Sequence, residues 1–293
     1  MAYNFGTKLK IYDLDELKTT KGTSWIIYNA SATRKTRVTG TLPGVTVHLV
    51  LDNGSNSANE ASDLLEIGGT HKAVPIAGLH ELNEAILTLH TSKDFLTKVD
   101  NVVIDNMVAI NSDAYHIISN LPRYKKDMLH ISDVVDSNPD KNAESKKMMP
   151  MYGDIQKVCY DLVRNMLELK ENYNVLLLAD EGVLTPTGDN PPVHAPILMP
   201  KINGPRSVKP VCSLFDEIYR TKFKAGEFDS KEGGIKTKFT LSTSNDPATG
   251  IQVYSKTRNI KNIDWLAANE MPADFRLIFK EIGYIIKSDR KKK

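Results

Sequence analysis

Short runs of apolar and β-branched residues alternate along this chain with longer segments of helical period. The runs are predicted to be strands, and they lie at residues 24–28, 45–51, 73–76, 101–104 and 174–179. Their nearly continuous apolar character is typical of strands buried on both faces. Strands that alternate with helices form a mostly parallel central sheet flanked by helices. We therefore expect an α/β fold.

Three segments carry the helical period most clearly. From Ile155 onward, apolar residues recur at spacings of three and four, which places them on one stripe. Residues 79–89 and 275–282 show the same spacing, and Pro272 is predicted to start the last helix. Between the parallel core and this terminal helix, polar turns separate predicted C-terminal antiparallel strands at residues 216–223, 235–242 and 251–256.

These elements suggest one core with two appendages. We expect an N-terminal segment at residues 1–22, a core at 23–262, and a C-terminal helix with a basic tail at 263–293. Residues 121–150 and 180–210 are rich in Pro, Asn, Asp and Lys. Both stretches are longer than ordinary connections, so they are predicted to be functional or disordered loops.

The composition excludes several classes of protein. With 41% hydrophobic and 25% charged residues among 293, the chain falls in the soluble globular range. Two cysteines without a CxxC motif indicate neither a disulfide framework nor a zinc site. The chain opens on polar residues without a secretion signal, and no apolar run approaches the ~20 residues of a membrane helix. We expect a cytoplasmic protein with no membrane partner.

The segment after the first predicted strand has the position of a phosphate-binding loop. Such a loop reads GxxxxGK[ST], in which glycines let the backbone wrap the phosphates, the lysine reaches them, and the hydroxyl holds magnesium. Lys35 and Thr36 match the template, but Asn29 and Arg34 replace its glycines. A nucleotide bound here would contact Ser31, Thr33, Arg34, Lys35 and Thr36.

Two interpretations of this loop stay open. The first is an altered triphosphate site with an extra cation, for which ATP and magnesium are the cofactors. Asn29 suits it because asparagine tolerates the left-handed backbone region. The second is a collapsed loop that binds no nucleotide. Arg34 favours the second, because its side chain stands where the backbone must approach the phosphates closely.

Further motifs follow in order along the chain. They are TLPG at 41–44, VVID at 102–105, YGDIQ at 152–156, NVLLLADE at 174–181, FDEIYR at 215–220 and SKTR at 255–258. With the loop, they resemble the phage nucleotide-binding AAA-domain family of RecA-like single-strand annealing recombinases, over residues 24 to about 262. The resemblance implies a RecA-like P-loop NTPase core with a degenerate Walker A motif.

The resemblance also assigns roles to acidic residues. Asp105 looks like the Walker B aspartate that holds magnesium with Thr36, although a carboxylate at a strand-to-helix junction is also a common helix cap. Asp52 stands where the family has the glutamate that polarises the attacking water, and Asp180 replaces a sensor histidine. The framework motifs are kept while the reactive positions change, which points to a weak or inactive ATPase.

Basic residues give candidate contacts to a partner. Lys256 and Arg258 are similar to the family's pair that faces the nucleotide of a neighbouring subunit, which implies a homo-oligomer; two cations on a late strand also suit a solvated edge. The two long stretches fall where RecA-like proteins have DNA-binding loops. Their candidate contacts to single-stranded DNA are Arg123, Tyr124, Lys125, Lys126, Lys201 and Arg206.

Three functions remain. The first is a phage recombination protein that binds single-stranded DNA and promotes annealing or strand pairing, with weak or lost ATPase activity. The second is a catalytically inactive protein of the same fold that assembles into oligomers. The third is an active ATPase with an unusual phosphate loop.

Overall fold

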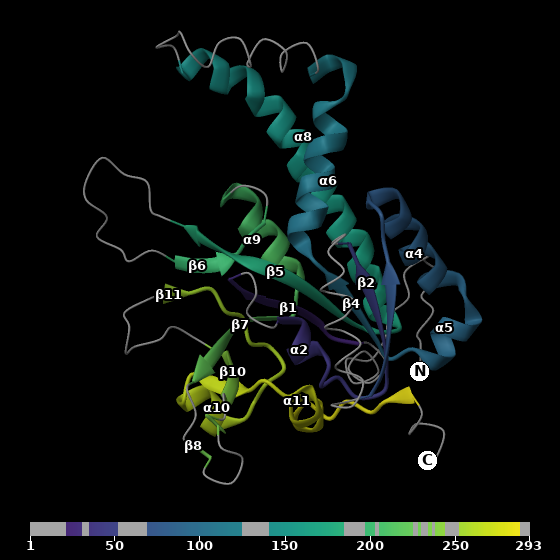
Figure 1. The fold of residues 1–293 in the computed structure, drawn as a ribbon, viewed down its shortest axis with the longest axis vertical. Helices are drawn as coiled ribbons and strands as arrows, with labels where there is room; N and C mark the ends of the chain where they lie inside the picture. Colours follow the sequence, from purple (N-terminus) through teal and green to yellow (C-terminus); the bar gives the residue numbers. More distant parts are fainter. Residues whose placement is uncertain are drawn as a thin grey trace, which may run out of the picture.

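The computed structural model describes residues 22–30, 35–51, 69–124, 141–184, 197–202, 205–224, 228–229, 234–235, 238–243 and 252–287. Ten of the described strands form one sheet (Figure 1). Its main path runs β12 (Glu270–Pro272), β10 (Lys238–Ser242), β7 (Glu217–Lys224), β1 (Ser24–Asn29), β5 (Asn174–Leu184), β4 (Asn101–Asp105), β2 (Val45–Val50) and β3 (Thr70–Pro75).

The centre of this sheet is parallel. All neighbours from β7 through β1, β5, β4 and β2 to β3 pair in the same direction, whereas β10 and β12 add antiparallel strands beyond β7. The far end of β5 pairs antiparallel with β6 (Ile197–Pro200), which pairs with β11 (Gln252–Val253). A separate pair is formed by β8 (Phe228–Asp229) and β9 (Gly234–Ile235). The predicted α/β fold with a mostly parallel sheet is confirmed.

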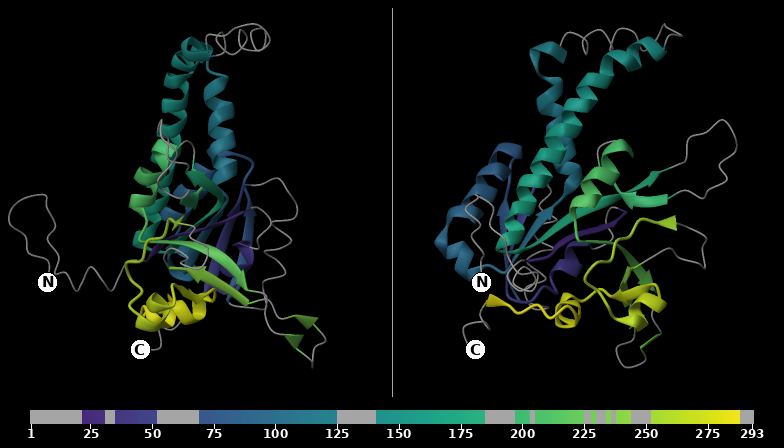
Figure 2. Two further views of the ribbon diagram at one scale, coloured as in Figure 1. Left: turned by 90° about the vertical axis from the view of Figure 1, so that its left-hand side faces the viewer. Right: turned by 180° about the vertical axis from the view of Figure 1, so that it is seen from behind.

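Helices cover both faces of the sheet (Figure 2). On one face, side chains of the central strands pack against α4 (Leu79–Thr91), α6 (Met107–Ser119), α8 (Lys141–Glu168) and α9 (Pro205–Leu214). On the other face lie α2 (Lys35–Thr39) and α11 (Phe275–Glu281), where Trp25 meets Phe275 edge-on at 5.3 Å. Shorter helices are α5 (Lys93–Lys98), α10 (Ile263–Ala267) and the 3-10 turn η1 (Leu169–Glu171).

One pair of helices extends past the sheet. The parts of α6 and α8 farthest from the strands rise beyond the layered core (Figure 1). The stripe predicted from Ile155 packs as expected, with Ile155, Cys159 and Val163 fully buried. None of the described helices is both long and apolar enough to cross a membrane.

The two stretches predicted to be loops contain regular structure where the structure describes them, so that prediction is wrong for residues 141–150, 180–184, 197–200 and 205–210. The end of the first stretch belongs to the 28-residue helix α8, which begins at Lys141 and contains Pro150. The second stretch holds the end of β5, then β6, then α9. Proline and asparagine content misled here because tertiary packing outweighed local propensity.

Four element predictions need correction. The strand predicted as antiparallel at 251–256 is the two-residue β11, which pairs parallel with β6. The strand predicted at 73–76 spans Thr70–Pro75 and is an exposed edge strand, not one buried on both faces. The strand near 216–223 belongs to the parallel core, since β7 pairs parallel with β1. Pro272 ends β12 and does not start the last helix. Asp274 caps α11 instead, accepting a hydrogen bond from the amide of Arg276 at 2.9 Å.

A buried carboxylate explains the glycine of the TLPG motif. Asp100 accepts hydrogen bonds from the amide of Val45 (3.0 Å) and from the amide of Lys287 (2.7 Å). Gly44, with φ at +81°, lies so close that a Cβ added to it would come within 2.4 Å of the Asp100 Oδ2. The left-handed backbone and the carboxylate therefore both require glycine.

We predict that Gly44→Ala lowers the free energy of unfolding by about 1–3 kcal/mol. Gly153→Ala is the matched control, because Gly153 lies in α8 with nothing within 4 Å of an added Cβ. There alanine is expected to raise stability by about 0.5–1 kcal/mol, since it restricts the unfolded chain. Urea denaturation measures both changes, and equal effects at the two positions would contradict this explanation.

Candidate functional site

Of the residues predicted for the nucleotide site, Lys35, Thr36 and Asp105 lie together at the carboxyl edge of the parallel strands. Asn29, Asp105 and Asp180 lie on β1, β4 and β5, and Asn29 stands directly beside Asp180 in the register of β1 and β5. The next element along the chain, α2, begins with Lys35 and Thr36. In open α/β sheets, ligands bind outside the carboxyl ends of the strands, so this edge is the candidate site.

Thr36 and Asp105, the two residues that the resemblance assigns to magnesium, are in contact. The Thr36 hydroxyl donates a hydrogen bond to the Asp105 carboxylate at 2.9 Å, and both side chains are buried. A hydroxyl and a carboxylate are oxygen ligands that suit magnesium. The alternative that Asp105 caps the next helix is wrong, because Asn106 caps α6 and accepts from the amide of Ala109 at 3.0 Å.

The phosphate side does not fit a triphosphate as it stands. The Lys35 ammonium forms an ion pair with Asp180, with 2.8 Å between Nζ and Oδ1. It also donates to the carbonyl oxygens of Asn29 and Ala30, each at 3.2 Å. The two charged side chains are 9% and 19% exposed, so the pair is sheltered from solvent screening. A phosphate would have to displace an acceptor that is already in place.

Asn29 has a different role from the one predicted. Among the described residues, Asn269 is the non-glycine residue with positive φ, so tolerance of the left-handed region does not explain Asn29. Its side-chain amide donates to the Thr221 carbonyl (2.6 Å) and hydroxyl (2.8 Å), and its side-chain oxygen accepts from the Ala30 amide (2.8 Å). Asn29 therefore ties the end of β1 to β7.

A second ion pair, between Arg220 and Glu181, lies on the opposite face of the sheet from the Lys35–Asp180 pair. Arg220 on β7 contacts Glu181, the residue after Asp180. Successive side chains of a strand point to opposite faces, so Glu181 faces away from Lys35. Arg220 and Lys35 are both neutralised by carboxylates of the same strand. Neither the Lys35–Asp180 pair nor the Arg220–Glu181 pair was predicted. The sequence signal that could have indicated them is the presence of two successive acids, Asp180 and Glu181, where β5 passes the phosphate loop.

Several predicted site residues lie outside the described residues. They are Ser31, Thr33, Arg34, Asp52, Lys125 and Lys126. The side chain of Arg206 is also outside the description, although its backbone belongs to α9. Their roles stay predictions.

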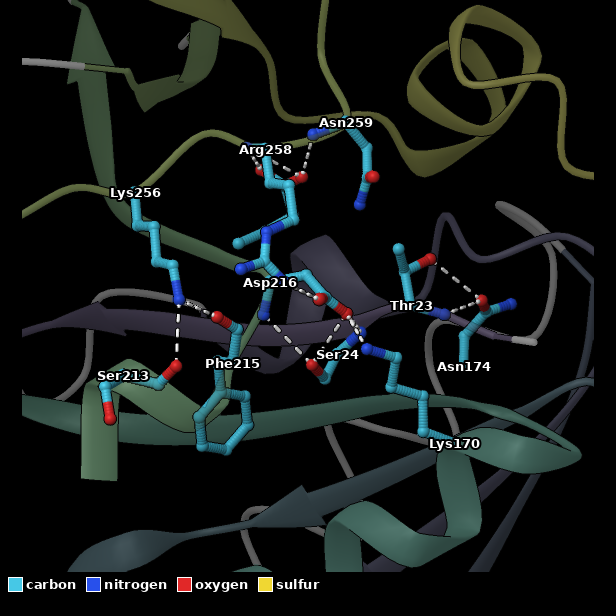
Figure 3. Close-up of polar contacts among 11 residues, drawn as sticks. Thr23, Ser24, Lys170, Asn174, Ser213, Phe215, Asp216, Lys256, Arg258 and Asn259 are labelled. Carbon is cyan, nitrogen blue, oxygen red and sulfur yellow. Dashed lines mark hydrogen bonds and ion pairs between the residues drawn. The ribbon is translucent and has the colours of Figure 1, made fainter. Parts of the chain in front are cut away.

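Lys256 and Arg258 lie at the opposite edge of the sheet, at the amino ends of β1 and β7 (Figure 3). The Lys256 ammonium donates to the carbonyl oxygens of Ser213, at 3.0 Å, and Phe215, just after α9. Arg258 pairs with Asp216 at 3.0 Å, and its side chain is 63% exposed. The five residue steps of β1 separate this edge from Asn29 by roughly 17 Å. The pair is therefore too far away to share one nucleotide with Lys35 of the same chain.

Two buried acids organise this amino edge. Asp216 accepts from the amide and hydroxyl of Ser24, each at 3.0 Å, and pairs with Lys170 at 2.5 Å. Burial acts to raise the pKa of Asp216, but the hydrogen bond and charge of Lys170 and the Ser24 donors outweigh it, so the pKa lies below its usual value. Burial raises the pKa of Glu217, which accepts from the amides of Arg258 and Asn259.

The predicted DNA contacts that the structure describes do not form one cluster. Arg123 and Tyr124 follow α6 and both contact Asp154 on α8, at 2.6 and 2.5 Å, and the Arg123 guanidinium lies 4.9 Å from the Tyr124 ring centroid. The aspartate of the YGDIQ motif thus anchors the end of α6, a role that the sequence did not reveal. Lys201 lies elsewhere, just after β6, where its amide donates to the Asp180 carbonyl at 2.6 Å.

The buried histidines form a core pair. His48 and His71 on β2 and β3 are 3.0 Å apart between Nε2 and Nδ1. Burial, with a contribution from His71, lowers the pKa of His48 to about 3, so His48 is neutral near pH 7. Within the described ranges, no three His, Cys, Asp or Glu side chains are grouped so that they could hold a metal ion.

Comparisons with known proteins add little to this geometry. No family model matches the chain, and no curated protein matches it. Among solved structures, the chain is similar to the flagellar accessory protein FlaH from Methanocaldococcus jannaschii. The two are 11% identical, the match covers 78% of this chain and 83% of that chain, and the TM-score is 0.34.

Because Lys256 holds two backbone carbonyls while Arg258 is mostly exposed, we predict unequal effects of their removal. Lys256→Ala should lower the free energy of unfolding by about 1–2 kcal/mol, as expected for hydrogen bonds from a charged donor. Arg258→Ala should cost about 0–1 kcal/mol, because Lys170 still pairs with Asp216. Urea unfolding of the two variants tests this. A larger loss from Arg258→Ala would contradict it.

Proposed function

We propose that this chain is a RecA-like recombination protein of the phage AAA-domain type, which binds single-stranded DNA and promotes annealing without turning over ATP. The observation that carries the proposal is the meeting of Lys35, Thr36, Asp105 and Asp180 at one edge of a parallel sheet. These residues come from three segments far apart in the sequence. The order of motifs in the resemblance anticipated that Thr36 and Asp105 would converge, which supports a core of the RecA type.

The absence of turnover is the part of the proposal that the contacts support most directly. Hydrolysis of a nucleoside triphosphate depends on positioned cations that neutralise the charge on the transferred phosphoryl group. Here the loop lysine is bound to a carboxylate, and Asp180 stands at the position where the family has a sensor histidine. The DNA-binding part draws on the resemblance and on the exposed Lys201 beside Asp180.

A second function is favoured by one specific observation. Arg123 and Tyr124, the strongest candidates for stacking on a base, are held by Asp154 within the chain. A protein that uses this fold only to assemble into oligomers does not need Arg123 to be available for DNA. In that case the chain forms ordered oligomers without DNA or nucleotide.

We predict salt-sensitive binding of a fluorescently labelled single strand without nucleotide, measured by anisotropy. Affinity should fall steeply between about 50 mM and about 200 mM salt, because each phosphate contact releases counterions. Lys201→Glu should weaken binding several-fold. Lys280→Glu is the matched control, since Lys280 is exposed on α11 across the sheet. Added Mg-ATP should change neither the affinity nor the phosphate released above a blank.

The possible outcomes separate the two functions. Failure to bind single strands at low salt, together with ordered oligomers in light scattering, would replace recombination by assembly. ATP hydrolysis that disappears in Lys35→Ala would remove the claim that turnover is lost and leave DNA binding to its own test.

A further inference from the structure

The ammonium of Lys35 has no hydrogen-bond donor left for a ligand. A lysine ammonium carries three N–H donors and no acceptor. In this chain, three acceptors lie within hydrogen-bond distance of Nζ: the carbonyl oxygens of Asn29 and Ala30 and the carboxylate of Asp180. The two carbonyls belong to the loop itself. Asp180 is the charged member, and at 2.8 Å it is the nearest of the three.

Asp180 is held in this place by the sheet. It pairs with Asn29 in the parallel register of β1 and β5, and its own carbonyl accepts from the Lys201 amide at 2.6 Å. The strand continues beyond it to Leu184 and pairs with β6, so the carboxylate is attached to a backbone fixed on two sides. A tethered group acts on its partner at a high effective concentration, which a free phosphate must overcome.

We propose that Asp180 is the internal anion of this site: its carboxylate takes the position at Lys35 Nζ that a phosphate oxygen takes in a P-loop protein, and so determines that triphosphates are excluded. The inference rests on the RecA-type core of the proposed function but not on DNA binding. It also differs from the steric explanation drawn from Arg34. That explanation places the obstacle in the Arg34 side chain, whereas here the obstacle is a negative charge on the neighbouring strand.

The charge of Asp180 can be removed without disturbing the rest of the site. Thr36 and Asp105 form their hydrogen bond with each other and not with Asp180, so removing the Asp180 charge leaves that contact in place. A displaced Asp180 carboxylate would still face the incoming phosphates and repel them, because like charges a few ångströms apart interact strongly where water is excluded. Replacing Asp180 by asparagine removes the charge and keeps the shape of the side chain, so it should allow a phosphate to bind at Lys35.

The test is calorimetric titration with Mg-ATP and, separately, with magnesium pyrophosphate, in the absence of DNA. Wild type should give no saturable heat up to millimolar ligand. Asp180→Asn and Asp180→Ala should each bind at least tenfold more tightly than wild type. In Asp180→Asn/Lys35→Ala the gain should disappear, which ties it to the lysine. Glu181→Gln is the matched control, since it removes the next carboxylate of the same strand, which pairs with Arg220, and should bring no gain.

Circular dichroism and thermal unfolding establish that each variant is folded, and two substitutions at one partly exposed position guard against loss of a single variant. The proposal is overturned if both folded Asp180 variants bind no better than wild type, if wild type itself binds Mg-ATP tightly, or if Glu181→Gln gives the same gain. A gain in Arg34→Gly alone would also overturn it in favour of steric exclusion. Because no titration contains DNA, failure to bind single strands leaves this outcome unaffected.

Discussion

The ion pair between Lys35 and Asp180 decides how the carboxyl edge of this sheet can be used. A lysine ammonium close to a strand end is the main attraction for a phosphate in a loop of this kind, and here a carboxylate 2.8 Å away already satisfies it. The pair is largely withdrawn from water, so breaking it would leave two poorly solvated charges. A ligand that needs Lys35 must first supply the free energy of that separation, and the magnesium side alone does not provide it.

The parallel arrangement is what brings the two partners together. Strand β5 lies beside β1, and Asp180 is in register with Asn29 at the end of β1, so the Asp180 carboxylate reaches Lys35 at the start of α2. The amino edge carries a separate polar cluster, in which Asp216 pairs with the Arg258 side chain and Glu217 accepts from the amides of Arg258 and Asn259. The same sheet thus separates two groups of charges by the length of its strands. At the carboxyl edge, acceptors of the chain surround the Lys35 ammonium. At the amino edge, the acids bind the segment that follows β11.

Prediction from sequence succeeded where one physical rule dominated. Strands β1 and β4 and the stripe of α8 followed from continuous or periodic apolar residues, because burial decides those elements. The order of the motifs predicted that Thr36 and Asp105 would lie together. No pattern of spacing could show that Lys35 would contact Asp180. That contact depends on the register between β1 and β5, which is set by the packing of the whole sheet. The loop predictions failed for a similar reason: α8 keeps Pro150 and β5 extends to Leu184 because neighbouring elements support them.

The most direct measurement is a crystal structure of the wild-type protein grown in several millimolar Mg-ATP. We expect the Lys35 ammonium to remain bound to the Asp180 carboxylate, with no triphosphate beside Thr36 and Asp105. A triphosphate oxygen on Lys35, with magnesium between Thr36 and Asp105 and the Asp180 side chain turned away, would contradict it.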